Sequence, residues 1–172
     1  MQPLLTTMLK NPESEWLARR SHPDLPRAAE YALREAGLAF SHAEHAERHL
    51  ARAAALAPDH DAVIIAHYRY YLYKHRFADA LPYAERCIKR SAERLGVAVD
   101  LFEVTALPAA EERLVRAYLF ACQAYGYILV RSGETDQGRA VLKRLIALDE
   151  GNQSRTQELW QAMHPAADEA DD

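Results

Sequence analysis

The chain of 172 residues is short of cysteine, glycine and proline. Its two cysteines, Cys87 and Cys122, lie in apolar helical runs and form no paired-cysteine motif, which favours two buried free thiols over a disulfide. Only 6 glycines and 8 prolines interrupt a sequence rich in Ala, Leu, Glu and Arg. That balance predicts a helical protein.

The sequence also lacks the marks of secreted and membrane-spanning proteins. Its first residues, MQPLLTTMLKNPESEW, do not combine a basic segment with a long apolar run, so no secretion signal is expected. The most apolar stretch, residues 117–130, is too short to cross a bilayer, and Arg116 and Arg131 bound it. We therefore expect a cytoplasmic protein with no membrane partner.

Most of the chain carries no excess of either charge. The formal net charge is −4, and Asp168, Glu169, Asp171 and Asp172 account for it, so residues 1–167 are neutral overall. A neutral body offers no electrostatic footprint for nucleic acid, and no nucleic-acid partner is expected. The acidic end of the chain, residues 164–172, is expected to be a disordered tail.

No motif of enzymatic chemistry occurs in the sequence. There is no phosphate-binding glycine loop, no G-x-S-x-G elbow, no C-x-x-C pair and no H-E-x-x-H. His67 could serve as a base, but a core histidine that hydrogen-bonds a neighbour is the more frequent role. Cys87 lies on a core stripe and is expected to be an inert thiol. We expect a non-catalytic protein without a cofactor.

What the chain does contain is a repeat. Ala43 aligns with Phe77 and Ala46 with Ala80, both at an offset of 34 residues, and small or apolar residues at these spacings form one stripe of a helix. Each repeated stretch is preceded by another stretch with helical character. The repeated stretches are 41–60, 75–94 and 133–152, and the preceding helices are expected at 27–40, 61–74 and 119–132.

Paired helices at this period resemble the tetratricopeptide repeat (TPR) family. Tyr71, Phe77 and Ala80 follow its Tyr–aromatic–Ala pattern. Gly138 departs from the family, which usually has Ala there. The resemblance implies an all-α, TPR-like α-solenoid of three helix pairs plus a C-terminal capping helix. Further matching residues are Gly126, Leu129 and Gly133, with Gly133 suited to a left-handed helix cap, and Ala53 with Pro58 at a repeat end.

The repeats divide the chain into an N-terminal arm (1–26), a TPR-like domain (27–163) and the acidic tail (164–172). An irregular insertion at 95–118 separates the second and third repeats. Within it, residues 97–107 could form a short strand, but an irregular segment packed on the helices is favoured, because no second strand is evident.

Local signals predict where several helices begin and end. Ser41 and Glu44 form a capping box that would open the second helix, and Gly96 is a helix stop. Pro108 suits the first position of the third repeat's long first helix. Asn152 is expected to cap a last helix at 153–163.

In TPR arrays the first helix of each pair lines a concave groove that holds a peptide or helix of a partner protein. Arg69 and Arg131, each near a tyrosine, would favour a partner with carboxylates and apolar side chains. Some of the tyrosines could instead pack against the chain's own Trp16, the 97–107 segment or the terminal helix. By helical phase the partner-binding groove residues are Tyr31, Glu35, Ile65, Arg69, Leu72, Tyr73, Gln123, Tyr127 and Arg131.

The favoured interpretation is a non-catalytic protein-interaction module that acts as an adaptor, assembly factor or regulator, and two alternatives to it remain open. The first is a homo-oligomeric scaffold, possible as a homodimer, whose groove is filled by the N-terminal arm. The second is a metal-binding protein that uses a stripe of His42, His45 and His49, since imidazoles one turn apart can chelate one ion. Each of these histidines precedes a core position, so a solvated polar face is favoured and no metal is expected.

Overall fold

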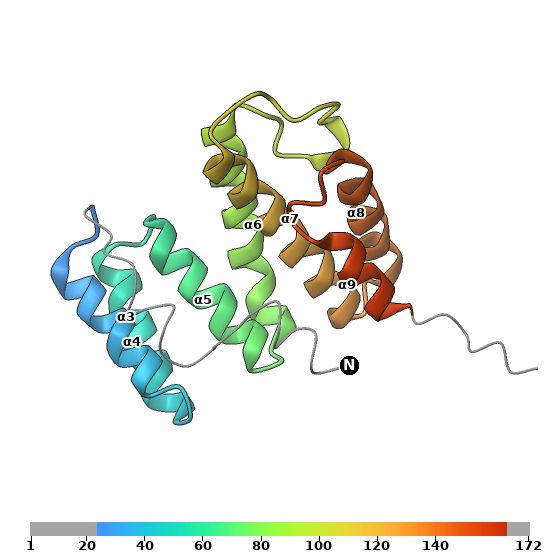
Figure 1. Ribbon diagram of the computed structural model, residues 1–172. Helices are drawn as coiled ribbons and strands as arrows, with labels where there is room; N and C mark the ends of the chain where they lie inside the picture. Colours follow the sequence, from blue (N-terminus) through green and yellow to red (C-terminus); the bar gives the residue numbers. More distant parts are fainter. Residues whose placement is uncertain (1–23, 165–172) are drawn as a thin grey trace, which may run out of the picture. The chain divides into compact units, whose positions relative to one another are not determined.

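The computed structural model describes residues 24–164 (Figure 1). Every regular element in this range is helical, which confirms the predicted all-α class for the described part of the chain. These residues divide into two compact units, 24–87 and 88–164, and the boundary falls inside one long helix. Most of the predicted N-terminal arm (1–23) and most of the acidic tail (165–172) lie outside the described residues.

The first unit is built on small residues that let its helices approach closely. Ala29, Ala32 and Ala36 from the first helix pack with Ala46 and Ala53 from the second, and all five side chains are buried. The alanines recur every three or four residues, so one face of each helix is apolar and the other remains polar. The helices of this unit are α3 (Arg27–Leu38), α4 (Ala43–Leu56), α5 (Asp61–Tyr73) and the first part of α6 (Phe77–Leu95).

Helix α5 is apolar almost all round, and the structure buries it on most sides. Its N-terminus is capped by His60, whose Nδ1 accepts a hydrogen bond from the Ala62 backbone N–H at 3.2 Å. A helix with this composition must be covered on more than one face. Its buried residues are Ala62, Val63, Ile64, Ala66, His67, Tyr68, Tyr70 and Leu72.

The predicted capping box at the start of α4 is wrong. The helix begins at Ala43, so His42 rather than Ser41 occupies the N-cap position, and no side chain caps the helix. The Ser41 hydroxyl instead lies 3.1 Å from the His42 ring nitrogen Nδ1. The residues before Ala43 form a turn, in which the Phe40 N–H donates to the Gly37 carbonyl at 3.2 Å and the His42 N–H donates to the Ala39 carbonyl at 2.8 Å.

Enlarging the alanine contacts should destabilise the protein. Ala46 in α4 and Ala80 in α6 are fully buried, so Ala46→Leu and Ala80→Leu each force neighbouring side chains apart. Overpacking of this kind should lower the free energy of unfolding by about 1–3 kcal/mol per substitution, measured by urea denaturation. Ala51→Leu on the exposed face of α4 is the matched control and should be nearly neutral. Equal stability of all three variants would contradict the repeat register.

In the second unit, the two helices that follow the irregular segment, α7 and α8, pack closely against each other. Gly126 of α7 and Gly138 of α8 lie where the helix backbones approach most closely, and added Cβ atoms would collide with the opposite helix. Gly133 ends α7 in the left-handed conformation (φ 105°), as predicted. The elements of this unit after α6 are the 3-10 helix η1 (Leu101–Glu103), α7 (Glu112–Ser132), α8 (Thr135–Leu148) and α9 (Thr156–Met163).

The insertion is irregular, as predicted, but shorter than the sequence suggested. Gly96 stops α6 with a positive φ of 74°, and α7 starts at Glu112, so the irregular segment covers 96–111 instead of 95–118. Pro108 therefore does not open α7. Buried Leu101 and Val104 hold the segment against α8, and Arg144 donates a hydrogen bond to the Val104 carbonyl.

The start of the last helix also differs from the prediction. Helix α9 begins at Thr156, and Arg155, in the left-handed conformation (φ 57°), occupies the N-cap position predicted for Asn152. Asn152 still contributes, because its Oδ1 accepts a hydrogen bond from the Gln157 N–H at 3.4 Å. Among the described residues, none of the helices is both long and apolar enough to cross a membrane.

Candidate protein-interaction surface

The predicted groove residues of α3 are accessible. Tyr31 is 49% exposed, and the Arg34 guanidinium carbon lies 5.4 Å from the centre of its ring. Glu35, one turn further along the helix, is half-buried. A tyrosine and two charged groups at this spacing form a polar and aromatic surface on α3.

On α5 the predicted residues divide into two groups. Arg69 and Tyr73 are half-buried, and the Arg69 Nε donates to the Tyr68 hydroxyl at 3.4 Å. Burial raises the pKa of Tyr73, and the nearby Arg69 charge opposes that rise, so the two side chains share one electrostatic environment. Ile65 is half-buried, whereas Leu72 is only 6% exposed and belongs to the packed interior, which corrects its assignment as a contact residue.

On α7 the structure gives the three predicted residues different roles. The Gln123 amide donates to the Ser154 carbonyl at 2.8 Å and to the Thr156 hydroxyl at 3.2 Å, so it anchors the loop before α9. Tyr127 is 5% exposed, and burial raises its pKa. Arg131 is exposed and donates to the Tyr127 hydroxyl at 2.6 Å. Of the three, Arg131 is therefore the residue that a partner can reach.

The nine predicted residues fall into separate surfaces. Six of them, from Tyr31 to Tyr73, belong to the unit 24–87, and the other three belong to the unit 88–164. The structure brings together Arg69 with Tyr73 and, separately, Arg131 with Tyr127.

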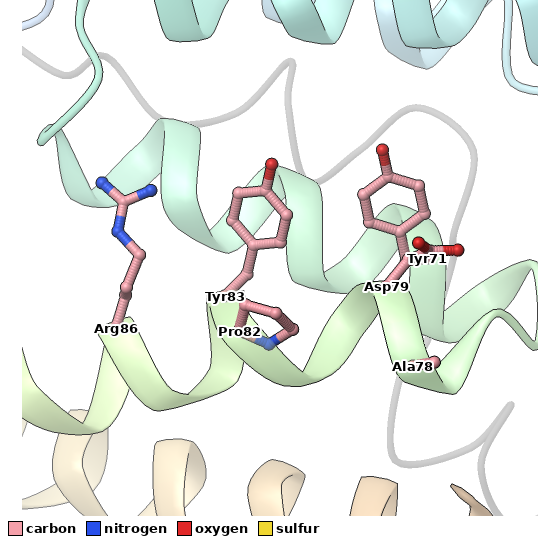
Figure 2. A pocket seen from close by; sticks show the side chains of 6 residues that line it. All are labelled: Tyr71, Ala78, Asp79, Pro82, Tyr83 and Arg86. Atoms are coloured by element: carbon pink, nitrogen blue, oxygen red, sulfur yellow. The ribbon is translucent and has the colours of Figure 1, made fainter.

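Sequence reasoning missed a pocket of about 390 Å³ in the first unit (Figure 2). Tyr71 and Tyr83 stack at a centroid distance of 5.9 Å, and Tyr83 also stacks on His67 at 4.6 Å. Figure 2 shows both tyrosines and Arg86 extending toward the same side. Tyr83 and Arg86 come from α6, the second helix of its pair, whereas the resemblance implied a groove lined by first helices. The lining residues are Tyr71, Ala78, Asp79, Pro82, Tyr83 and Arg86.

A second missed feature is an exposed aromatic residue on α7. Phe120 is 38% exposed, and the Arg116 guanidinium carbon lies 5.8 Å from its ring centre. Arg116 and Phe120 lie one turn apart, and Arg131 follows three turns after Phe120 on the same side of the helix. Extending the helical phase from Arg131 toward the N-terminus of α7 would have identified both residues.

The histidine stripe lies on a polar face of α4, as predicted. His42 and His45 are exposed with their rings stacked at 6.2 Å, and His49 is half-buried. Their neighbours Glu44 and Arg48 form an exposed ion pair at 2.9 Å. Between residues 24 and 164 no group of three His, Cys, Asp or Glu side chains is arranged to hold a metal ion.

His67 is a core histidine, as predicted. Its side chain is 3% exposed, and the ring Nδ1–H donates to the Val63 carbonyl at 2.8 Å. Burial lowers its pKa; the Val63 hydrogen bond opposes this shift and the Arg86 charge adds to it. Cys122 is likewise a buried thiol, and burial raises its pKa to about 12, while Cys87 is half-buried.

The His67 environment predicts a pH-dependent stability. The pKa of His67 in the folded protein lies below the ordinary value of 6.5. As the pH falls through 6.5, the His67 ring is therefore protonated in the unfolded chain before it is protonated in the folded protein. The stabilisation is complete above pH 6.5 and should fall as the pH drops below it. His67→Phe, which keeps a ring against Tyr83, should show a smaller loss of stability between pH 7.5 and 5.5 in urea titrations. An equal loss in both proteins would contradict this assignment.

Comparisons with known proteins supply a relative but no family. No protein-family model matches the chain, and no solved structure matches it. The chain is 38% identical over 112 residues to an uncharacterized 19.8 kDa protein in the nifW 5′ region of Azotobacter chroococcum mcd 1. The match covers 62% of this chain and 63% of that relative, so the chain spans less than two thirds of the relative's length.

Proposed function

We propose that this protein is a non-catalytic, cytoplasmic interaction module of TPR-like helix pairs that acts as an adaptor, assembly factor or regulator. Its partner is another protein, which presents a peptide or helix carrying both carboxylates and apolar side chains. The observation that carries the proposal is the pairing of an arginine with tyrosines on two first helices. Arg69 of α5 lies beside Tyr68 and Tyr73, and Arg131 of α7 bonds Tyr127.

This pairing suits the recognition of an acidic partner. The hydroxyl contacts hold each guanidinium group against an aromatic side chain, so less side-chain freedom is lost when a carboxylate binds. Guanidinium groups bind carboxylates through paired hydrogen bonds, and the adjacent rings provide apolar contact area. Exposed Tyr31 and half-buried Ile65 extend this mixed surface along α3 and α5.

A homo-oligomeric scaffold is a second candidate, favoured by one observation. Leu38 is 70% exposed and Tyr31 is 49% exposed, and the two lie two turns apart on the same face of α3. A second copy of the chain could cover that face. The mass of the full chain in solution, measured by light scattering, separates this scaffold from a monomeric adaptor.

The proposed function is tested by reversing the two arginines. Arg69→Glu combined with Arg131→Glu should abolish retention of the partner from an extract of the source cells. Reversing desolvated charged anchors typically costs about 2–5 kcal/mol, which is roughly 30-fold to several thousand-fold in affinity. Once the retained partner is identified, calorimetry with the purified protein gives the affinity directly.

The matched control reverses two exposed arginines elsewhere, Arg52→Glu and Arg139→Glu. This control changes the net charge equally and should retain the partner. Circular dichroism should show the same helix content in both variants. Unchanged affinity of the Arg69→Glu, Arg131→Glu protein would contradict binding through Arg69 and through Arg131.

A further inference from the structure

The outward face of α7 is basic and aromatic. Arg113, Arg116 and Arg131 are exposed on it, Phe120 is 38% exposed and Ala124 is half-buried. These five residues define the arginine–phenylalanine face, and their spacings of three, four and seven residues place them on one side of the helix. Glu112 lies 3.6 Å from Arg116, and both side chains are more than half exposed, so this ion pair is weak.

The positive charges on this face have a defined spacing. The Arg116 guanidinium carbon lies 5.8 Å from the Phe120 ring centre, and that of Arg131 lies 5.7 Å from the Tyr127 ring centre. The two guanidinium groups therefore lie near the levels of residues 120 and 127, two turns apart. At a rise of 1.5 Å per residue this separation is about 10 Å along α7.

The acidic tail carries its charges at the same spacing. Its carboxylates form two adjacent pairs, Asp168 with Glu169 and Asp171 with Asp172, and the second pair begins three positions after the first. In an extended chain three residues span about 10 Å. Ala170 lies between the two pairs and is small enough to pass over an apolar side chain.

The acidic tail follows helix α9, which belongs to the same unit as α7. The start of α9 is held to α7, because the Gln123 amide donates to the Thr156 hydroxyl at 3.2 Å. Figure 1 shows α7 and α9 running in the same direction within this unit, so the C-terminal end of α9 lies toward the C-terminal end of α7. From His164 to Asp168 the chain can span about 13 Å.

We propose that residues 168–172 dock on the arginine–phenylalanine face of α7, with one acidic pair at Arg131 and the other at Arg116. The tail is then an internal substitute for an acidic partner at Arg131. The docking itself is independent of the proposed function. Its consequence, that a partner must displace the tail, rests on the proposed function.

The docking is tested by nuclear magnetic resonance on the full chain. In the wild-type protein, raising NaCl from about 0.02 M to about 0.5 M screens exposed charges and should shift the backbone amide signals of residues 166–172 and of α7. A tail-neutral variant (Asp168→Asn, Glu169→Gln, Asp171→Asn, Asp172→Asn) should show the high-salt α7 signals already at low salt. Arg116→Gln with Arg131→Gln should release the tail in the same way.

The matched control is Arg52→Gln with Arg139→Gln, which removes the same charge from exposed positions off this face. Its tail signals should equal those of the wild-type protein. Tail signals that are the same in the wild-type protein and the Arg116→Gln, Arg131→Gln variant would overturn the docking, as would release of the tail by the control alone.

A separate measurement tests the displacement of the tail. The tail-neutral variant should retain more of the partner from cell extract than the wild-type protein does, because no internal carboxylates compete. Equal retention would overturn the competition while leaving the docking supported. Salt-dependent docking in a protein that retains no partner at all would contradict the proposed function and not the docking.

Discussion

Gly138→Ala is expected to lower the free energy of unfolding by about 2 kcal/mol or more, because added bulk at a tight contact forces the backbone to shift. A Cβ atom at this position would lie 2.6 Å from the Gly126 carbonyl oxygen and 2.7 Å from the Val130 backbone nitrogen. Both atoms belong to the backbone of α7, so the clash cannot be relieved by a side-chain rotation. Helices α7 and α8 would have to separate.

The sign of this effect is diagnostic. In an exposed helix, replacing glycine by alanine stabilises by about 1 kcal/mol, so a loss of stability must come from the contact between the two helices. Gly151→Ala is the control, since its nearest neighbours are Gln153 side-chain atoms at 3.7 Å and beyond, and it should be nearly neutral. Urea denaturation measures both variants. A Gly138→Ala protein as stable as the wild type would refute the close contact.

The Gly138 contact also shows which structural features a sequence repeat can predict and which it cannot. Helical periodicity correctly predicted α8 and its buried stripe, because apolar spacing depends on the sequence of one segment. The departure from alanine at Gly138 could be seen in the sequence but not explained. Its cause is the distance between two backbones, which depends on residues in another helix.

Helix starts were less predictable than helices. Ser41 and Pro108 have suitable chemistry for a helix N-terminus, yet α4 begins at Ala43 and α7 begins at Glu112. The energy of a cap or of a first-turn proline is about 1 kcal/mol, so the packing of the adjoining turn can displace a helix start by several residues.

The candidate surface was predicted in part, for a related reason. Helical phase correctly placed Tyr31 and Arg131 on accessible faces. It also selected Gln123, Leu72 and Tyr127, which the structure buries or commits to internal contacts. Helical phase predicts the direction in which a side chain points, but not which other segment covers that side chain. Gln123 is bonded by the loop before α9, which lies more than twenty residues further along the chain.

That loop depends on one buried carboxylate, Asp149, which is 2% exposed. The Asp149 side chain accepts hydrogen bonds from the Ser154 backbone N–H at 2.8 Å, the Ser154 hydroxyl at 2.7 Å and the Gln153 backbone N–H at 3.0 Å. Ser154 is fully buried, so its backbone N–H has no access to water as a replacement acceptor. The carboxylate therefore determines the path of the chain from α8 to α9.

Asp149→Ala should lower the free energy of unfolding by about 3 kcal/mol or more, because each buried donor left without a partner costs about 1–3 kcal/mol. The Ser154 hydroxyl keeps its contact with Thr156 at 2.6 Å, but the buried Ser154 backbone N–H has no substitute acceptor. Asp149→Asn retains a carbonyl acceptor and should lose less, and Glu150→Ala, at an exposed position, should be nearly neutral. Urea denaturation gives the ranking, and hydrogen exchange should be faster across α9 in Asp149→Ala. Equal stability of the Asp149→Ala and Glu150→Ala proteins would show that the carboxylate does not hold the loop.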